Sequence, residues 1–154
     1  MVSSLGSIAR GCLESGIDAS MNTLSPSQLA ELVSNLPLNG PHVLVDVVGH
    51  AAVLTSEHAH ALLRVARGLS EWHKIVATLV IGDLYFDNEF VDYAIDMLTL
   101  AASGEDASAV VMHANNLLLS RKAITDNQYD RIVQLPVGTP GKEALLANLK
   151  DRIV

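Results

Sequence analysis

Residues 86–103 show the clearest helical period in the 154-residue chain, and this period limits what the chain can fold into. The polar residues of the stretch recur at steps of three and four, so on a helix they form one narrow stripe, and apolar residues fill the remaining surface. A helix with so little polar surface belongs inside a bundle of helices. Asp87 can cap its amino end, and Ser103-Gly104 supplies the stop. The stripe consists of Glu89, Asp92, Asp96, Thr99 and Ser103.

The composition also favours packed helices. Apolar residues make up 49% of the chain and aromatic residues only 4%, so the core must be built from Leu, Val, Ile and Ala. The mean hydropathy of +0.31 suggests that some apolar surface is buried against other chains. A net charge of −7 without a basic cluster argues against nucleic acid as a direct partner, because phosphates are bound by Lys and Arg. Since Cys12 is the only cysteine, and neither a secretory signal nor a bilayer-spanning apolar run is found, we expect an intracellular, soluble protein.

Residues 1–40 are predicted to form an amino-terminal helical extension, followed by a helical core over residues 41–154. Within residues 1–20 the apolar side chains keep helical spacing, but Gly6, Gly11 and Gly16 interrupt the pattern, and each costs about 1 kcal/mol in a helix interior. This segment is therefore expected to become ordered only against another surface. Docking on the rest of the chain is favoured, and contact with a membrane surface is the alternative. A turn rich in Pro and Gly at residues 37–41 marks the predicted boundary.

Several helices are predicted from signals at their amino ends. An apolar residue followed by a capping residue occurs at positions 24–25, 54–55, 86–87 and 124–125. The signal is strongest at Ser25, because Pro26 takes the first helical position and Gln28 can complete a capping box. Residues 43–53 are ambiguous, since their β-branched run favours a strand; we choose a helix because no other strand is available for pairing. Gly68 leaves open whether the helix that starts near residue 55 and the apolar run capped by Ser70 are two helices or one kinked helix.

Candidate metal ligands occur near the helix that begins after residue 55. Glu57 and His60 form a Glu-x-x-His pair, the spacing that places two ligands of a di-metal site on one helix face, and Asp46 and His50 are also one turn apart. Such a site needs a second motif that the chain lacks. A solvated helix start is therefore the favoured interpretation of His58 and His60. Catalytic motifs and Gly-rich phosphate loops are absent, and we expect no enzymatic activity.

The acidic stripe is the remaining candidate site. Glu89, Asp92 and Asp96 carry carboxylate oxygens that could hold Ca²⁺. They could equally meet Arg64 and Arg67, or the same residues of a neighbouring subunit. The favoured interpretation of these three residues is a solvated helix face, because carboxylates are rarely buried.

Two short blocks carry a resemblance to a known family. The first is Ser25-Pro26-Ser27-Gln28-Leu29-Ala30-Glu31-Leu32-Val33-Ser34-Asn35-Leu36-Pro37, followed by Gly40. The second is Ile81-Gly82-Asp83-Leu84, which precedes the carboxylate-rich helix. They resemble blocks of the nucleocapsid shell protein of cystoviruses, the enveloped double-stranded RNA bacteriophages.

The resemblance implies a mainly helical subunit with a four-helix core and an amino-terminal extension. It further implies trimers that build an outer capsid shell around the inner capsid particle, beneath a lipid envelope, with calcium-dependent assembly and a part in crossing the host membrane. The expected locations are the virion and, during assembly, the host cytoplasm. Two other functions stay open: a small acidic helical adaptor or inhibitor that binds a host protein, and, less favoured, a metal-dependent helical-bundle enzyme.

Overall fold

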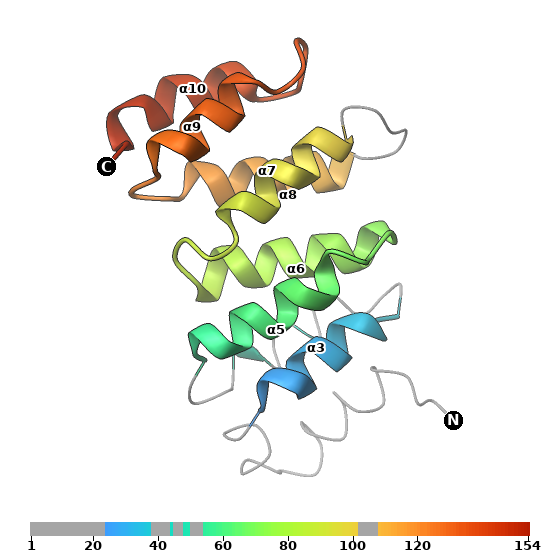
Figure 1. Ribbon diagram of the computed structural model, residues 1–154. Helices are drawn as coiled ribbons and strands as arrows, with labels where there is room; N and C mark the ends of the chain where they lie inside the picture. The colour runs from blue at the N-terminus through green and yellow to red at the C-terminus, as the bar shows by residue number, and fades with distance from the viewer. Residues whose placement is uncertain (1–23, 38–43, 45–47, 50–53, 102–107) are drawn as a thin grey trace. The chain divides into compact units, whose positions relative to one another are not determined.

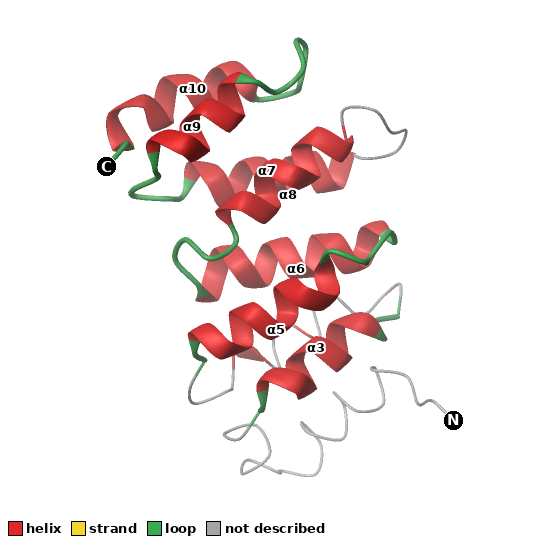
Figure 2. Ribbon diagram, viewed as in Figure 1, coloured by secondary structure: helices red, strands yellow, loops and turns green. Residues whose placement is uncertain are grey.

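The computed structural model describes residues 24–37, 44, 48–49, 54–101 and 108–154. Within these residues the chain forms helices and no strand, so the predicted all-α class is confirmed (Figures 1 and 2). The chain divides into two compact units, Met1–Ile81 and Gly82–Val154. The predicted boundary near residue 40 lies outside the described residues. None of the described helices has the length and apolar character that crossing a membrane requires.

In the first unit, helix α3 (Pro26–Ser34) packs along helix α5 (Ser56–Ala66), as Figure 1 shows. The capping box predicted for α3 is present: the Ser25 side chain accepts the Gln28 N–H at 3.1 Å, and the Gln28 side chain accepts the Ser25 N–H at 2.8 Å. The apolar face of α5 points inward as well. The buried residues that these two helices contribute include Leu29, Leu32, Val33, Ala59, Leu62 and Ala66.

Helix α6 (Trp72–Tyr85) is separate from α5, which settles the question that Gly68 left open. Its residues 75–79 are all buried, whereas Trp72 and Leu84 near its two ends are half exposed. Thr78 is fully buried and donates its hydroxyl hydrogen to the Lys74 carbonyl at 2.9 Å, which satisfies the polar group within the helix. In the ambiguous segment before α5, the described residues Leu44, Val48 and Gly49 are helical, as chosen.

The second unit contains helices α7 (Val91–Ala101), α8 (Ser108–Leu119), α9 (Asp126–Val133) and α10 (Lys142–Leu149), followed by a short 3₁₀ turn, η1 (Lys150–Arg152). Helix α7 packs along α8, and α10 packs against both α9 and α8. The end of the chain closes on the segment before α9, since Ile124 and Ile153 form an isolated parallel bridge. The core of the unit includes Phe90, Tyr93, Ile95, Leu98, Ala114, Leu117, Leu118, Ile132, Leu145 and Leu149.

The helix predicted to begin after Asp87 starts later, at Val91. The reason lies in Arg121, whose Nη1 donates hydrogen bonds to the carbonyl oxygens of Phe86, at 2.8 Å, and Asp87. These bonds hold Phe86 and Asp87 in the connection that leaves α6. Residues 87–90 form bends and a turn, and the buried ring of Phe90 packs against Gly82.

Candidate functional site

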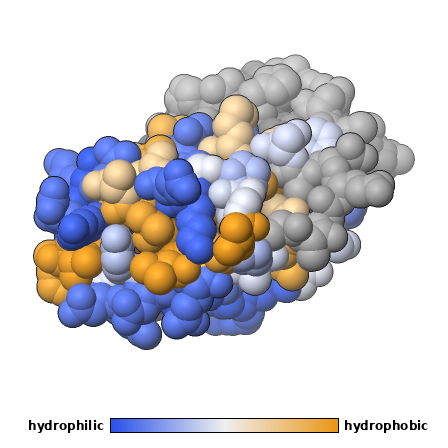
Figure 3. Space-filling model, turned by 90° about the horizontal axis from the view of Figure 1, so that it is seen from above, coloured by the Kyte–Doolittle hydropathy of each residue, from blue (hydrophilic) through white to orange (hydrophobic). Residues whose placement is uncertain are grey.

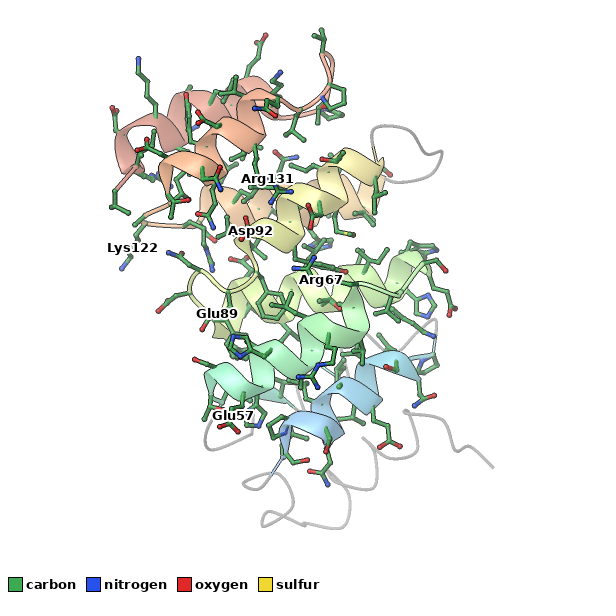
Figure 4. All side chains as sticks on the ribbon, viewed as in Figure 1. Glu57, Arg67, Glu89, Asp92, Lys122 and Arg131 are labelled. Carbon is green, nitrogen blue, oxygen red and sulfur yellow. The ribbon has the colours of Figure 1, made fainter. Side chains whose placement is uncertain are left out.

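The predicted acidic stripe meets an arginine from another helix. Arg131 of α9 donates from Nη1 to Oδ1 of Asp92 at 3.0 Å and from Nη2 to Oδ1 of Asp96. Asp92 and Asp96 lie one turn apart on α7, so both carboxylates face the same guanidinium. Figure 4 shows Arg131 beside Asp92. We call these three residues the Asp92–Asp96–Arg131 cluster; it links α7 to α9 in the second unit.

The cluster lies at the surface. The side chains of Asp92, Asp96 and Arg131 are exposed by 52%, 33% and 34%, so solvent screens their charges. Burial lowers the pKa of Arg131, but the hydrogen bonds and charges of Asp96 and Asp92 outweigh it and hold that pKa above its ordinary value. The guanidinium is therefore charged at every physiological pH.

Glu89 does not share this arrangement. It lies in the turn before α7 rather than on the helix, because the helix begins at Val91. Its Oε1 is buried and has no hydrogen-bond partner among the described residues. The stripe predicted as one row of carboxylates is thus an ion-paired couple, Asp92 and Asp96, plus a separate Glu89; Ser103 lies outside the described residues.

No three metal-ligating side chains converge within the part of the chain that the structure describes. Asp92 and Asp96 supply two carboxylates, and Arg131 already neutralises part of their charge. A divalent ion at this position would have to compete with the guanidinium. The predicted calcium stripe stays a prediction, with Arg131 as a competitor that the sequence did not indicate.

His58 has a structural role, so the predicted solvated position is wrong for this residue. It is 5% exposed, and its Nδ1 accepts the Thr55 N–H at 3.1 Å. The ring hydrogen is therefore on Nε2, which donates to the Leu24 carbonyl at 2.6 Å. The ring is buried because it bridges the start of α5 to the segment that enters α3. His60 and Glu57 are exposed, as predicted, and Asp46 and His50 lie outside the described residues.

A second buried histidine holds the other end of α3. His73 of α6 is 5% exposed, and its Nε2 lies 2.9 Å from the Leu36 carbonyl oxygen. The carbonyls on both sides of α3, Leu24 and Leu36, are therefore each bound by an imidazole. Sequence reasoning missed this pair, because His58 and His73 lie more than thirty residues from the carbonyls that they bind.

Arg121 is the main polar residue inside the second unit, and sequence reasoning missed it as well. It follows α8, is 6% exposed, and binds the carbonyls of Phe86, Asp87 and Asp83 together with the Asp83 carboxylate. The distance from its Nη2 to Oδ1 of Asp83 is 2.9 Å. Arg121 thereby fixes the connection between α6 and α7. Its role is structural, since these four hydrogen bonds all go to the segment that leaves α6 and leads to α7.

Large apolar side chains remain exposed in the second unit. Figure 3 shows apolar side chains among hydrophilic ones on the face seen from above. Val137 and Val154 are almost fully exposed, at 98% and 80%. The other large apolar residues of this unit that are at least 45% exposed are Leu84, Leu100, Met112 and Val133.

Comparison with protein-family models, with curated proteins and with solved structures finds no match for this chain.

Proposed function

We propose that the chain is a structural subunit that assembles with copies of itself into the nucleocapsid, or outer capsid, shell of a virus. The observation that carries the proposal is the set of exposed large apolar side chains of the second unit, headed by Val137, Val154 and Leu100. Apolar surface of this kind is stabilised when a neighbouring subunit covers it. The two sequence blocks that resemble the cystovirus shell protein support the same function.

The proposal includes the partners that this resemblance implies. Subunits would associate as trimers, and the trimers would surround an inner capsid particle. For residues 1–20, contact with a membrane surface is the alternative to docking on the rest of the chain. The protein would then occur in the virion and, during assembly, in the host cytoplasm. Direct contact with nucleic acid is not part of the proposal, because the net charge of −7 repels phosphates.

Calcium is the ion that we propose for the acidic stripe. Asp92, Asp96 and Glu89 supply oxygen ligands, and a site between subunits could gain further ligands from a neighbouring copy. Calcium binding would require Arg131 to leave its carboxylates. Replacement of the Arg131 guanidinium by Ca²⁺ would couple the contact between α7 and α9 to assembly.

Electron microscopy of the concentrated full chain, with and without Ca²⁺, tests the proposed function. We expect shell fragments or closed particles that become more numerous when Ca²⁺ is added. If the folded chain stays dispersed under both conditions, the shell function is wrong, and a monomeric adaptor becomes the better interpretation.

A further inference from the structure

An open groove of about 670 Å³ runs between α3 and α5 in the first unit. One wall comes from α3 and includes Ala30 and Glu31; the other comes from α5 and includes Glu57, His60, Ala61 and Arg64. The distance at which two helices can pack depends on the side chains at their contact. Because alanines lie on both walls, a helix from another molecule can approach the groove closely. We call this surface the α3–α5 groove.

The charged side chains of the groove have no partners of their own in the described residues. Glu31, Glu57, His60 and Arg64 are all exposed, and none of the four side chains forms a hydrogen bond or an ion pair with a described residue. Arg131 and Arg121 of the second unit, by contrast, are paired with Asp92 and Asp83. The groove therefore presents both signs of charge to whatever binds it.

The order of these charges along α5 is complementary to itself when the helix is reversed. Glu57 and Arg64 lie seven residues, or about 10 Å, apart, and His60 and Ala61 lie midway between them. If two copies of α5 cross antiparallel between His60 and Ala61, Glu57 of each copy faces Arg64 of the other. A two-fold interface requires this kind of self-complementary surface.

We propose that the α3–α5 groove binds the same groove of a second copy of this chain, through an antiparallel contact between the two α5 helices. Glu57 pairs with Arg64 of the partner subunit, and Arg64 pairs with the partner's Glu57. The two-fold axis passes between His60 and Ala61, and the small side chain of Ala61 permits the close approach. Glu31 on the opposite wall adds a further carboxylate near the bound helix.

This inference rests on the proposed function and adds a specific contact to it. A trimer closes on itself by rotation, so trimers alone do not form a lattice. A two-fold contact between subunits of different trimers supplies the second interface that a shell needs. The second unit, with its exposed apolar side chains, stays available for the contacts within a trimer.

Charge reversal in the full chain tests the contact by sedimentation velocity. The variants Glu57→Arg and Arg64→Glu each replace two attractive pairs by repulsive ones. We expect the dissociation constant of each variant to be at least about tenfold higher than that of the wild type. In an equimolar mixture of the two variants, every pair between unlike chains is attractive again. Association should therefore recover on mixing, and also in the double variant Glu57→Arg/Arg64→Glu.

Glu143→Arg is the matched control, because Glu143 is also an exposed acid in the first turn of a helix, α10. It should associate as the wild type does. Single variants that associate normally, or a mixture that does not recover, would overturn the groove contact while leaving the shell function intact. A wild-type chain that is monomeric at every concentration would overturn both. Circular dichroism confirms that each variant is folded.

Discussion

His58 connects two segments of the first unit through one imidazole ring. In α3 and α9 the third helical residue, which completes the capping box, is Gln28 or Gln128, whereas in α5 it is His58. Glutamine can accept the same backbone N–H but is less suited to reach the Leu24 carbonyl. A histidine at this position therefore joins the capping of α5 to the anchoring of α3.

Substitution of His58 should separate the two interactions. We expect His58→Ala to lower the free energy of unfolding by about 2–3 kcal/mol, because it removes a cap and a buried hydrogen bond. His58→Gln keeps the cap and should cost about 1 kcal/mol. Urea unfolding monitored by the fluorescence of Trp72, the only tryptophan, measures both. Equal losses for the two variants would show that the cap contributes nothing, and no loss in His58→Gln would show that the bond to Leu24 contributes nothing.

His113 should make the stability of the second unit depend on pH. Burial lowers its pKa from the ordinary 6.5, and the charge of Asp83 opposes this only in part. Below pH 6.5 the unfolded chain therefore binds a proton more readily than the folded chain, so acid favours unfolding. Unfolding in urea between pH 7.5 and 5 should show stability falling with pH, and falling less in His113→Gln. Parallel curves for the two proteins would contradict the assignment.

At the scale of elements, interactions between neighbours in sequence were predictable and distant ones were not. The capping boxes at Ser25 and Thr125 join residues three apart, so the sequence is sufficient to locate the starts of α3 and α9. The start of α7 depends on Arg121, which lies 34 residues from Asp87. Likewise Asp92 was recognised as exposed, but its partner Arg131 is 39 residues away, and no local pattern connects them.

The buried face of α7 can be tested by two adjacent substitutions. Leu98 is fully buried, whereas Thr99 is exposed and, among the described residues, its hydroxyl bonds to the Ile95 carbonyl of its own helix. Leu98→Ala should lower the free energy of unfolding by about 2–5 kcal/mol through cavity formation. Thr99→Ala should change it by less than about 0.5 kcal/mol. Comparable losses in thermal unfolding would show that the helix face is misassigned.

The Asp92–Asp96–Arg131 cluster can be tested from both of its sides. Surface ion pairs contribute little, so Asp92→Asn/Asp96→Asn should cost no more than about 1 kcal/mol of stability. If the stripe binds calcium, this double variant should no longer respond to Ca²⁺ in light scattering. Arg131→Met removes the competing cation and should respond at a lower Ca²⁺ concentration than the wild type. An unchanged calcium response in both variants would exclude the stripe as the calcium site.

At the scale of the whole molecule, the chain combines a helical core with apolar surface and a net negative charge. The all-α class followed from the periodicity and from the shortage of aromatic residues, and the structure confirms it in the described residues. The division of the chain after Ile81, within α6, had no sequence signal. Gly82 stands alone at this boundary, whereas a linker is marked by a cluster of Pro and Gly such as the one at residues 37–41, from which the boundary near residue 40 was predicted.

The measurement that tests the central claim most directly is the mass of the full chain by sedimentation equilibrium over a range of concentrations. A subunit of 16.4 kDa that assembles into a shell should give masses that are multiples of this value and that increase with concentration. The increase should be larger with Ca²⁺ than with a chelator. A mass of 16.4 kDa at every concentration, with and without Ca²⁺, would contradict the claim that this protein is an assembly subunit.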